Sequence, residues 1–485
     1  MTERNAGGIH KGFALALLAS TQFVLILDAA IVGVALPSIG RDLGLAREDL
    51  SWVANGYTLM FGGFLLLGGR IADLVGRRRM FIVGLILFSI ASLGGALAQS
   101  GLWLVLARGV QGLGAALISP AALSLVMTLF REGSERNKAL GVWGAVAGSG
   151  GAAGVILGGV LTEWLGWESV LYVNVPIGIA AALLATRLLP EGREAAIGRN
   201  FDVSGAVTVT AGLALLVYAL VDANDAGWGS AQTLGLAAVA VLLLAVFVAI
   251  ERRTTQPLVP LAIFRNRTLR GANIVSVATT MAMFPMFFFL TLYTQQVLGY
   301  EPLEAGLAQL PLALSIIVTA GLASQLVNRI GYKPVLVSGL VIVAVGLAWF
   351  AQVSAGGSFF ADILGPSIVA GFGGAFAFIA GTIAATTGVT GQQAGLASGL
   401  VNTSQQIGGA LGLAVLIAIA TARTEAVEGP LPTALAEGFQ TGFVGAAALA
   451  LVGALLALVL LSGRDSRAHA EASAAPQPEP ARAAA

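Results

Sequence analysis

Two charged residues interrupt apolar segments of the sequence, and together they could handle a proton. Asp28 lies in LILDAAIVGVALP, residues 25–37, inside an apolar run that begins at Phe13. Arg108 lies in another apolar run, at a depth of roughly 10 Å if that run is helical. A charge at the centre of a bilayer costs about 2.5–3.5 kcal/mol, and such residues usually face an interior pathway. Asp28 is therefore predicted to bind and release a proton, since burial disfavours an ionised carboxyl group.

Arg108 is the predicted partner of the ionised Asp28, because both residues fall in the outer half of a membrane of normal thickness. Protonation of Asp28, or the arrival of a substrate, would then release Arg108. Two alternatives stay open. Asp28 could be a structural residue that only holds helices together, and the two charges could form a permanent ion pair.

The residue types exclude several other kinds of chemistry. Cysteine is absent, which excludes disulfides and thiolate nucleophiles or metal ligands. The only histidines, His10 and His469, lie near the two ends of the chain. None of the three lysines follows a phosphate-binding loop. We therefore expect no catalytic residues, no metal, no cofactor and no nucleic-acid partner, and we predict that the protein is not an enzyme.

The composition is that of an integral membrane protein. Hydrophobic residues make up 57% of the chain and charged residues 11%, against about 25% charged residues in soluble domains. We count fourteen apolar runs of about 20 residues, the length that crosses the hydrocarbon core as a helix. The predicted fold class is all-α, with fourteen transmembrane helices. An unusually apolar soluble protein is the disfavoured alternative.

The distribution of basic residues predicts the orientation. Lys and Arg are enriched in cytoplasmic loops of membrane proteins. If both termini are cytoplasmic, 22 of the 26 Lys and Arg residues fall in cytoplasmic loops, helix ends or tails. Three are external, Arg41, Arg47 and Arg423, and Arg108 is inside a span. The high Ala, Gly and Arg content suggests a bacterial source, so the predicted location is the bacterial cytoplasmic membrane.

An internal repeat divides the chain into two similar parts. RIADLVGRRRMFIVGL, from Arg70, resembles QLVNRIGYKPVLVSGL, from Gln325, and the same offset places Asp73 on Asn328 and Gly84 on Gly339 (328 − 73 = 255; 339 − 84 = 255). Parallel repeats related by an axis along the membrane normal form the two halves of some transporters. Six helices in each half and two between them account for the fourteen runs.

Five separated segments resemble motifs of the major facilitator superfamily, and in particular of its fourteen-helix drug:proton antiporters. They are GGRIADLVGRRRMF at 68–81, LDAAIVGVALP from Leu27, LARGVQGLGAA from Leu106, YVNVPIG from Tyr172 and LYTQQVLGYEPLEAGLAQLP from Leu292. The resemblance runs from Phe13 to about Gly463. It implies the major facilitator fold, exchange of drugs for protons, and a part in proton relay for Arg108.

The resemblance also implies a gate in the segment at 68–81. Its glycines, Gly69 and Gly76, permit a tight turn. The family implies a latch between the two halves, and the candidate residues for it are Asp73, Arg77 and Arg78. Arg131 or Arg136 are the predicted partners of this latch. Asn328 carries no charge, so the latch should be one-sided; a plain basic cytoplasmic loop is the alternative.

Two motifs depart from the family pattern, and one of them has Trp167, Glu168 and Ser169 where the family has Trp-Arg-Trp. GSGGAAGVILGG, from Gly148, keeps the glycines of the antiporter motif, Gly154, Gly158 and Gly159, but has Val155 where the family has proline. Glycines at this spacing still allow close packing of helices. The missing proline leaves proton symport open as an alternative to antiport.

The substrate pocket is predicted from amide and aromatic side chains in or near the apolar runs. Such a pocket would suit amphipathic drugs, and a carboxylate nearby would attract cationic ones. The aromatic residues could instead pack in the core or face lipid. The predicted pocket residues are Gln22, Gln111, Asn174, Phe288, Tyr293, Gln295, Gln296, Asn402 and Gln405.

The predicted function is proton-coupled export of amphipathic drugs by a protein that is expected to work as a monomer. A same-fold exporter of one metabolite or self-made antibiotic is the main alternative, whereas a channel or a scaffold fits poorly. The predicted organisation is a cytoplasmic tail at 1–12, a six-helix half at 13–189, a loop and two linker helices at 190–270, a second half at 271–462, and a disordered tail at 463–485.

Overall fold

The computed structural model describes residues 8–45, 47–190, 202–254, 257–389 and 393–474. These residues form helices joined by short loops, and no strand occurs within the described ranges. The helices are α1 (Gly8–Leu43), α2 (Arg47–Val75), α3 (Arg77–Ala96), α4 (Gly101–Leu129), α5 (Ser134–Leu165), α6 (Ser169–Tyr172), α7 (Asn174–Leu188), α8 (Val203–Ala226), α9 (Ala231–Arg253), η1 (Leu261–Arg265), α10 (Arg267–Leu292), η2 (Tyr293–Val297), α11 (Pro302–Ala308), α12 (Leu310–Ile330), α13 (Tyr332–Phe350), η3 (Phe359–Ile363), α14 (Leu364–Thr386), α15 (Ala394–Ala426), α16 (Leu431–Leu460) and α17 (Gly463–Ala474).

The described residues contain thirteen helical segments that are long and apolar enough to cross a membrane. The apolar part of α8, Ser204–Leu220, is shorter and brings the number to fourteen. Some of these segments combine two elements, as in α6 with α7 and α11 with α12. The predicted all-α membrane fold is confirmed, and the protein is a multi-pass membrane protein.

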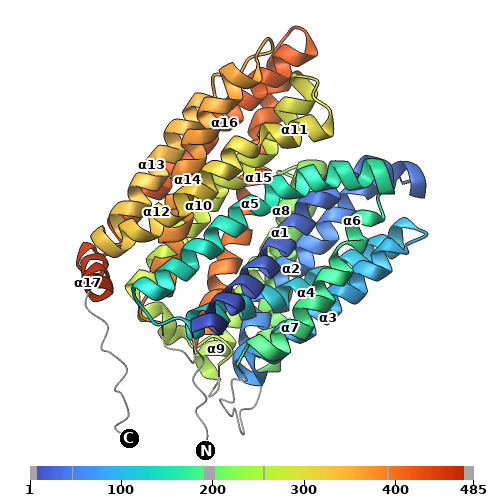
Figure 1. Cartoon of the computed structure of the whole chain (residues 1–485). Coiled ribbons are helices and arrows are strands. Elements are labelled where there is room, and N and C mark those ends of the chain that lie inside the picture. Colours follow the sequence, from blue (N-terminus) through green and yellow to red (C-terminus); the bar gives the residue numbers. More distant parts are fainter. Residues whose placement is uncertain (1–7, 46, 191–201, 255–256, 390–392, 475–485) are drawn as a thin grey trace, which may run out of the picture.

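The helices form two bundles that lie side by side. In the first bundle α1 packs on α5, and α4 packs on both α2 and α3. In the second bundle α10 packs on α15 and α16, and α13 packs on α14 and α16. Figure 1 shows the first bundle in blue to green and the second in yellow to red. We call these bundles the N-half and the C-half.

The same type of glycine contact occurs once in each half. In the N-half, a Cβ atom added to Gly84 of α3 would lie 2.9 Å from the carbonyl oxygen of Gly114 in α4. In the C-half, one added to Gly339 of α13 would lie 2.9 Å from the carbonyl oxygen of Gly373 in α14. Small residues let membrane helices approach closely. The repeat that pairs Gly84 with Gly339 in the sequence therefore also appears in the packing.

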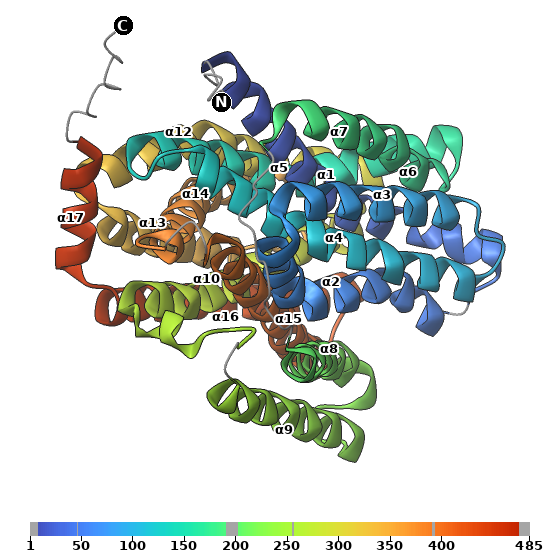
Figure 2. The same cartoon turned by 90° about the horizontal axis from the view of Figure 1, so that it is seen from below.

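The two linker helices lie at the side of the bundles. α8 contacts α2 and α15, whereas α9 packs mainly on α8 and is the outermost helix (Figure 2). Only 17% of the apolar window of α9 is buried, compared with 78% for α4. This exposure is what a helix facing lipid on most sides requires.

The start of α1, helix α17 and the segment Gly69–Arg78 lie at the same end of the molecule, which we call the cytoplasmic end after the sequence-based orientation (Figure 1). The predicted boundaries change at both termini. α1 begins at Gly8 rather than after residue 12. The prediction of disorder from residue 463 is wrong up to Ala474, because this segment is the helix α17, which buries Ser466, His469 and Ala470. Residues 475–485 lie outside the described ranges.

Candidate functional site

Asp28 of α1 and Arg108 of α4 form an ion pair inside the N-half. Arg108 Nη1 lies 2.6 Å from Asp28 Oδ2, and the side chains are buried, with Asp28 0% and Arg108 1% exposed. Charge-assisted hydrogen bonds of this kind are about twice as strong as neutral ones. The structure therefore brings together the two residues that the sequence singled out by their charge.

Two amide side chains complete the surroundings of the Asp28 carboxylate. Gln111 Nε2 and Asn174 Nδ2 both donate to Asp28 Oδ1, at 2.8 and 2.6 Å. Both nitrogens also lie within hydrogen-bond distance of Ser92 Oγ, which itself donates to the Leu171 carbonyl oxygen. The carboxylate thus accepts three N–H groups, and such donors stabilise its ionised form.

Arg108 has further partners that do not depend on Asp28. Its Nη1 donates to Gln111 Oε1 at 2.7 Å, and its Nε donates to the Val53 carbonyl oxygen at 3.2 Å. The guanidinium carbon lies 4.5 Å from the centroid of the Tyr57 ring, within the range of a cation–π contact. Arg108 is therefore held from α2 and α4 as well as by the aspartate of α1.

Two of the predicted motif glycines bring α5 against the part of α1 that carries Asp28. A Cβ atom on Gly154 would lie 2.7 Å from Ala30 Cβ, and one on Gly158 would lie 3.0 Å from the Ile31 carbonyl oxygen. Gly159 meets α11 of the C-half only at ordinary contact distance. Val155, at the position of the family's proline, packs on Gly306 of α11 and so contributes to the contact between the halves.

The carboxylate of Asp73 connects α2 to the C-half at the cytoplasmic end. Arg77 pairs with it at 3.0 Å, and the backbone N–H groups of Gly395 and Leu396 donate to it at 3.0 and 2.9 Å. Unpaired N–H groups at a helix N-terminus favour an anion, and these two belong to the first turn of α15. The carboxylate thus bridges an arginine of its own half and a helix end of the other.

Other residues of the predicted gate support this contact. Gly69 approaches so closely that an added Cβ would lie 2.6 Å from the Gly395 carbonyl oxygen, and Gly76 has a positive φ of 117° at the turn into α3. Arg78 donates to the Thr186 carbonyl oxygen within the N-half. The prediction of Arg131 or Arg136 as latch partners is wrong among the described residues, because the helix N-terminus supplies the positive charge.

The equivalent position in the C-half makes a neutral contact with the N-half. Asn137 Nδ2, at the start of α5, donates to Asn328 Oδ1 at 2.5 Å. Asn328 Nδ2 in turn lies 3.4 Å from Ser134 Oγ. The contact of Asn328 is thus uncharged, and the prediction missed its partners on α5. A charged contact does exist beside it, because Glu132 Oε1, in the loop before α5, accepts from the backbone N–H of Gly388 in the C-half at 3.1 Å.

A third polar contact joins the halves between α1, α4 and α15. Ser119 Oγ lies 3.2 Å from Gln22 Oε1 and 3.1 Å from Asn402 Oδ1. Ser119 was not predicted, although a hydroxyl directly before Pro120 in an apolar run could have indicated it. Gln405, on α15, is half-buried.

The other predicted pocket residues do not join this contact, so the prediction of one shared pocket is wrong. Gln111 and Asn174 bind Asp28 instead. Tyr293 is buried at the far end of the C-half, where its hydroxyl donates to the Ser354 carbonyl oxygen. Gln295 and Gln296 follow in η2, half-buried and exposed, and Phe288 is 36% exposed beside Phe289.

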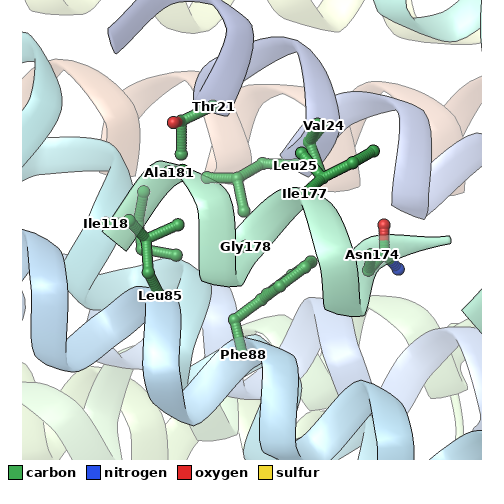
Figure 3. Close-up of a pocket in the computed structure, with 10 residues that line it drawn as sticks. All are labelled: Thr21, Val24, Leu25, Leu85, Phe88, Ile118, Asn174, Ile177, Gly178 and Ala181. Atoms are coloured by element: carbon green, nitrogen blue, oxygen red, sulfur yellow. The ribbon is translucent and has the colours of Figure 1, made fainter. Parts of the chain in front are cut away.

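A small cavity lies within the N-half next to this network (Figure 3). It is lined mainly by apolar side chains of α1, α3, α4 and α7, with Asn174 at one edge. Its cavity volume is about 10 Å³, which is room for about one water molecule at most and far below the roughly 300–1,000 Å³ of ligand pockets. The cavity is therefore too small for a drug-sized substrate. Within the described ranges, no group of three or more His, Asp or Glu residues could hold a metal ion.

Two parallel helical halves, a buried ion pair and contacts that join the halves at one end define a membrane transporter. The sequence model of the Major Facilitator Superfamily matches residues 18–413, so the protein belongs to this superfamily.

Curated relatives match over nearly the whole chain. The chain is 39% identical over 479 residues to "Puromycin resistance protein pur8" of Streptomyces alboniger, which covers 97% of this chain and 95% of the relative. It is 40% identical over 450 residues to "Cephamycin export protein CmcT" of Amycolatopsis lactamdurans, and this alignment covers 92% of this chain and 92% of the relative. Among solved structures, the proton:xylose symporter XylE aligns with a TM-score of 0.64 at 14% identity, over 91% of this chain and 94% of that one. This last likeness concerns the fold alone.

Proposed function

We propose that the protein is a proton-coupled exporter of amphipathic drugs or antibiotics. It works by alternating access in the bacterial cytoplasmic membrane, with both termini in the cytoplasm. The buried pair of Asp28 and Arg108 carries this proposal, because only one of its members can lose its charge. A carboxylate becomes neutral by taking up a proton, whereas an arginine side chain stays charged in proteins.

The contacts of the pair indicate what protonation would change. A proton on Asp28 removes the negative charge and one acceptor site from a carboxylate that accepts three N–H groups. Arg108 keeps its contacts with α2 and α4, namely the Val53 carbonyl oxygen and the Tyr57 ring. Protonation therefore loosens α1 from α4 and α7 while Arg108 stays in place.

A shift of α1 relative to α4 would reach the contact between the halves. α1 also carries Gln22 and α4 also carries Ser119, the two N-half residues that meet Asn402. A substrate with hydrogen-bonding groups would compete for these side chains. The proton site and the substrate would then act on the same two helices, which is the coupling that exchange requires.

The contacts between the halves correspond to one state of the proposed cycle. The polar contacts of Asp73 with α15 and of Asn328 with α5 close the cytoplasmic end. In such a state Asp28 would take up a proton from outside as the drug leaves to the outside, and it would release that proton to the cytoplasm when the next drug binds there. One proton that crosses about 100 mV yields roughly 2.3 kcal/mol, enough for roughly fiftyfold accumulation of an uncharged drug.

Export of one antibiotic rather than many drugs is a second candidate. It is favoured by relatives that are named for single compounds, puromycin and cephamycin. Resistance of expressing cells to a panel of unrelated antibiotics separates the two, since a specific exporter protects against one compound class.

The test is efflux of a cationic dye from cells that express the wild type or Asp28→Asn, with and without a protonophore. Asp222→Asn, which removes a half-buried carboxylate that accepts from Gln232 outside the site, is the matched control. We expect efflux from the wild type and the control only, and none when the proton gradient is abolished. Full activity of Asp28→Asn would show that Asp28 is a structural residue and that the proposed coupling is wrong.

A further inference from the structure

Helix α17 follows the last span and lies at the cytoplasmic end, along the outer edge of the C-half beside α12 and α13 (Figures 1 and 2). It lies beyond residue 413, where the match to the superfamily ends. Ser466, His469 and Ala470 are 1%, 8% and 6% exposed, and their spacing places them on one face of the helix. The opposite face, with Arg467 and Glu471, is exposed.

Several contacts fix α17 to the C-half. The backbone N–H of Lys333 donates to Ser466 Oγ at 3.0 Å. The hydroxyl of Thr268, at the start of α10, lies 3.3 Å from Asp465 Oδ2. The His469 ring packs against Tyr332 at the start of α13, with 5.7 Å between the ring centroids. These contacts come from two helices of the C-half and would move with it.

The same face of α17 also reaches the N-half. His469 Nε2 lies 3.0 Å from Nδ2 of Asn137, in the first turn of α5. A Cβ atom added to Gly133, directly before α5, would lie 3.5 Å from Cα of Ser473. Asn137 is also the residue that binds Asn328, so α17 covers the neutral contact between the halves.

We propose that α17 is a strap that holds the cytoplasmic end closed, and that protonation of His469 releases the strap from α5. The proposal rests on the alternating access proposed above, since the cytoplasmic ends of α5 and of the C-half must separate when this end opens. α17 stays bound to the C-half in both states.

The hydrogen bonds of Asn137 make the contact sensitive to protonation. Its Nδ2 is the donor to Asn328 Oδ1, so its second N–H is the one that faces His469. Nε2 of His469 must then be the acceptor, which requires a neutral ring with its proton on Nδ1. A protonated ring would place an N–H against an N–H, and the bond to α5 would be lost.

Burial and the neighbouring charges shift the pKa of His469 in opposite directions. Burial lowers the pKa of His469 below its ordinary value, Glu132 opposes this effect, and Arg136 adds to it. The titratable and charged groups of the surrounding elements are Glu132, Arg136, Tyr332, Lys333 and Asp465. Because the strapped state binds the proton more weakly, the strap is intact above about pH 6.5 and is released as the pH falls below that value.

Such a strap would respond to the protons that the transporter itself brings in. Acidification of the cytoplasm would loosen the cytoplasmic end and let the transporter open there more often. The response would be separate from the proton binding at Asp28, which lies inside the N-half.

Spin labels can test the strap directly, because the chain has no native cysteine to remove. Arg79→Cys on the N-half would be combined with Arg467→Cys on α17, and in a second protein with Arg329→Cys on the C-half; all three residues are exposed. Distances would be measured by pulsed electron paramagnetic resonance in lipid nanodiscs between pH 8 and 5.5. We expect the ratio of long to short distances to rise several-fold at the acid end in both proteins, because the strapped state binds the proton on His469 more weakly than the released state.

Variants of His469 provide the controls. His469→Gln can still accept from Asn137 but cannot titrate, so its distances should not change with pH. His469→Lys, charged throughout, should show the long distances even at pH 8. His10→Gln, at the only other histidine, should behave as the wild type.

A pH response of His469→Gln equal to that of the wild type, or no response of the wild type, would overturn the proposal. Dye exchange by the same proteins in liposomes is measured in parallel. Exchange without a pH-dependent distance would leave the transport function standing and remove the strap. A pH-dependent distance without exchange would keep the strap as a conformational device and count against the transport function.

Discussion

The two partners of the buried ion pair should differ in how their removal affects stability at different pH. Asp28→Asn leaves Arg108 as a buried charge that stays protonated. Arg108→Gln leaves Asp28, which can become neutral by taking up a proton. Removing one partner of a buried pair costs about 3–5 kcal/mol when the other charge remains.

The pH dependence follows from proton linkage. In Arg108→Gln the folded protein would hold a proton on Asp28 that the unfolded chain does not hold above about pH 5. Its stability should then fall by about 1.4 kcal/mol for each unit of rising pH, and lowering the pH from 7 to 5 should recover up to about 2.7 kcal/mol. Asp28→Asn has no group to protonate at this site, so its loss of stability relative to the wild type should be the same at pH 5 and at pH 7.

Thermal unfolding of the purified proteins in detergent, followed by the fluorescence of the seven tryptophans, gives the comparison. Each variant is compared with the wild type at the same pH, so that groups that titrate in both proteins cancel. The double variant Asp28→Asn with Arg108→Gln removes both charges and should be more stable than Asp28→Asn alone. If Arg108→Gln loses as much stability at pH 5 as at pH 7, Asp28 does not take up a proton when it is unpaired, and the argument for a proton site fails.

Three further predictions concern the packing and the contacts between the halves. Gly154→Val should displace α1 at Asp28, at a cost of about 1–3 kcal/mol, and abolish dye efflux, whereas Gly151→Val, where an added Cβ meets nothing within 4 Å, should keep it. Asp73→Asn removes the negative charge from the α15 N-terminus and should raise the labelling rate of a cysteine at the cytoplasmic end; unchanged labelling would contradict its part in closing that end. Ser119→Ala removes a hydroxyl shared by two amide side chains and should change the KM for dye by roughly two- to tenfold, as the loss of one hydrogen bond implies. Ser124→Ala, at a buried hydroxyl without a hydrogen-bond partner among the described residues, is its control and should leave the KM unchanged.

The sequence predicted the helices and the ion pair for simple physical reasons. Apolar runs of spanning length leave few alternatives to membrane helices. A charge such as Asp28 or Arg108 inside such a run needs a partner, and few candidates of opposite charge exist at a similar depth. The pairing of these two residues could therefore be predicted without knowing which helices are neighbours.

The amide side chains could not be placed in the same way. An amide in an apolar run is compatible with a substrate pocket, with a charged partner and with a contact between helices. Gln111 lies three residues after Arg108, so its position beside Asp28 follows from the helix once the pair is known. The position of Asn174 depends on how α7 packs against α1 and α3, which no local pattern encodes.

The contacts between the halves could be predicted from the sequence only in part. The loss of charge at Asn328, relative to Asp73, could be read from the repeat. The partners of Asn328 could not, because they are Asn137 and Ser134, which lie 191 and 194 residues away in the chain. A carboxylate is favoured at a helix start by its negative charge as well as by hydrogen bonds. Asn328 instead binds side chains of α5, and α17 covers one of them, Asn137. The two halves share a repeat, yet among the described residues only the contact of Asn328 lies beside a histidine, a side chain that burial makes harder to protonate.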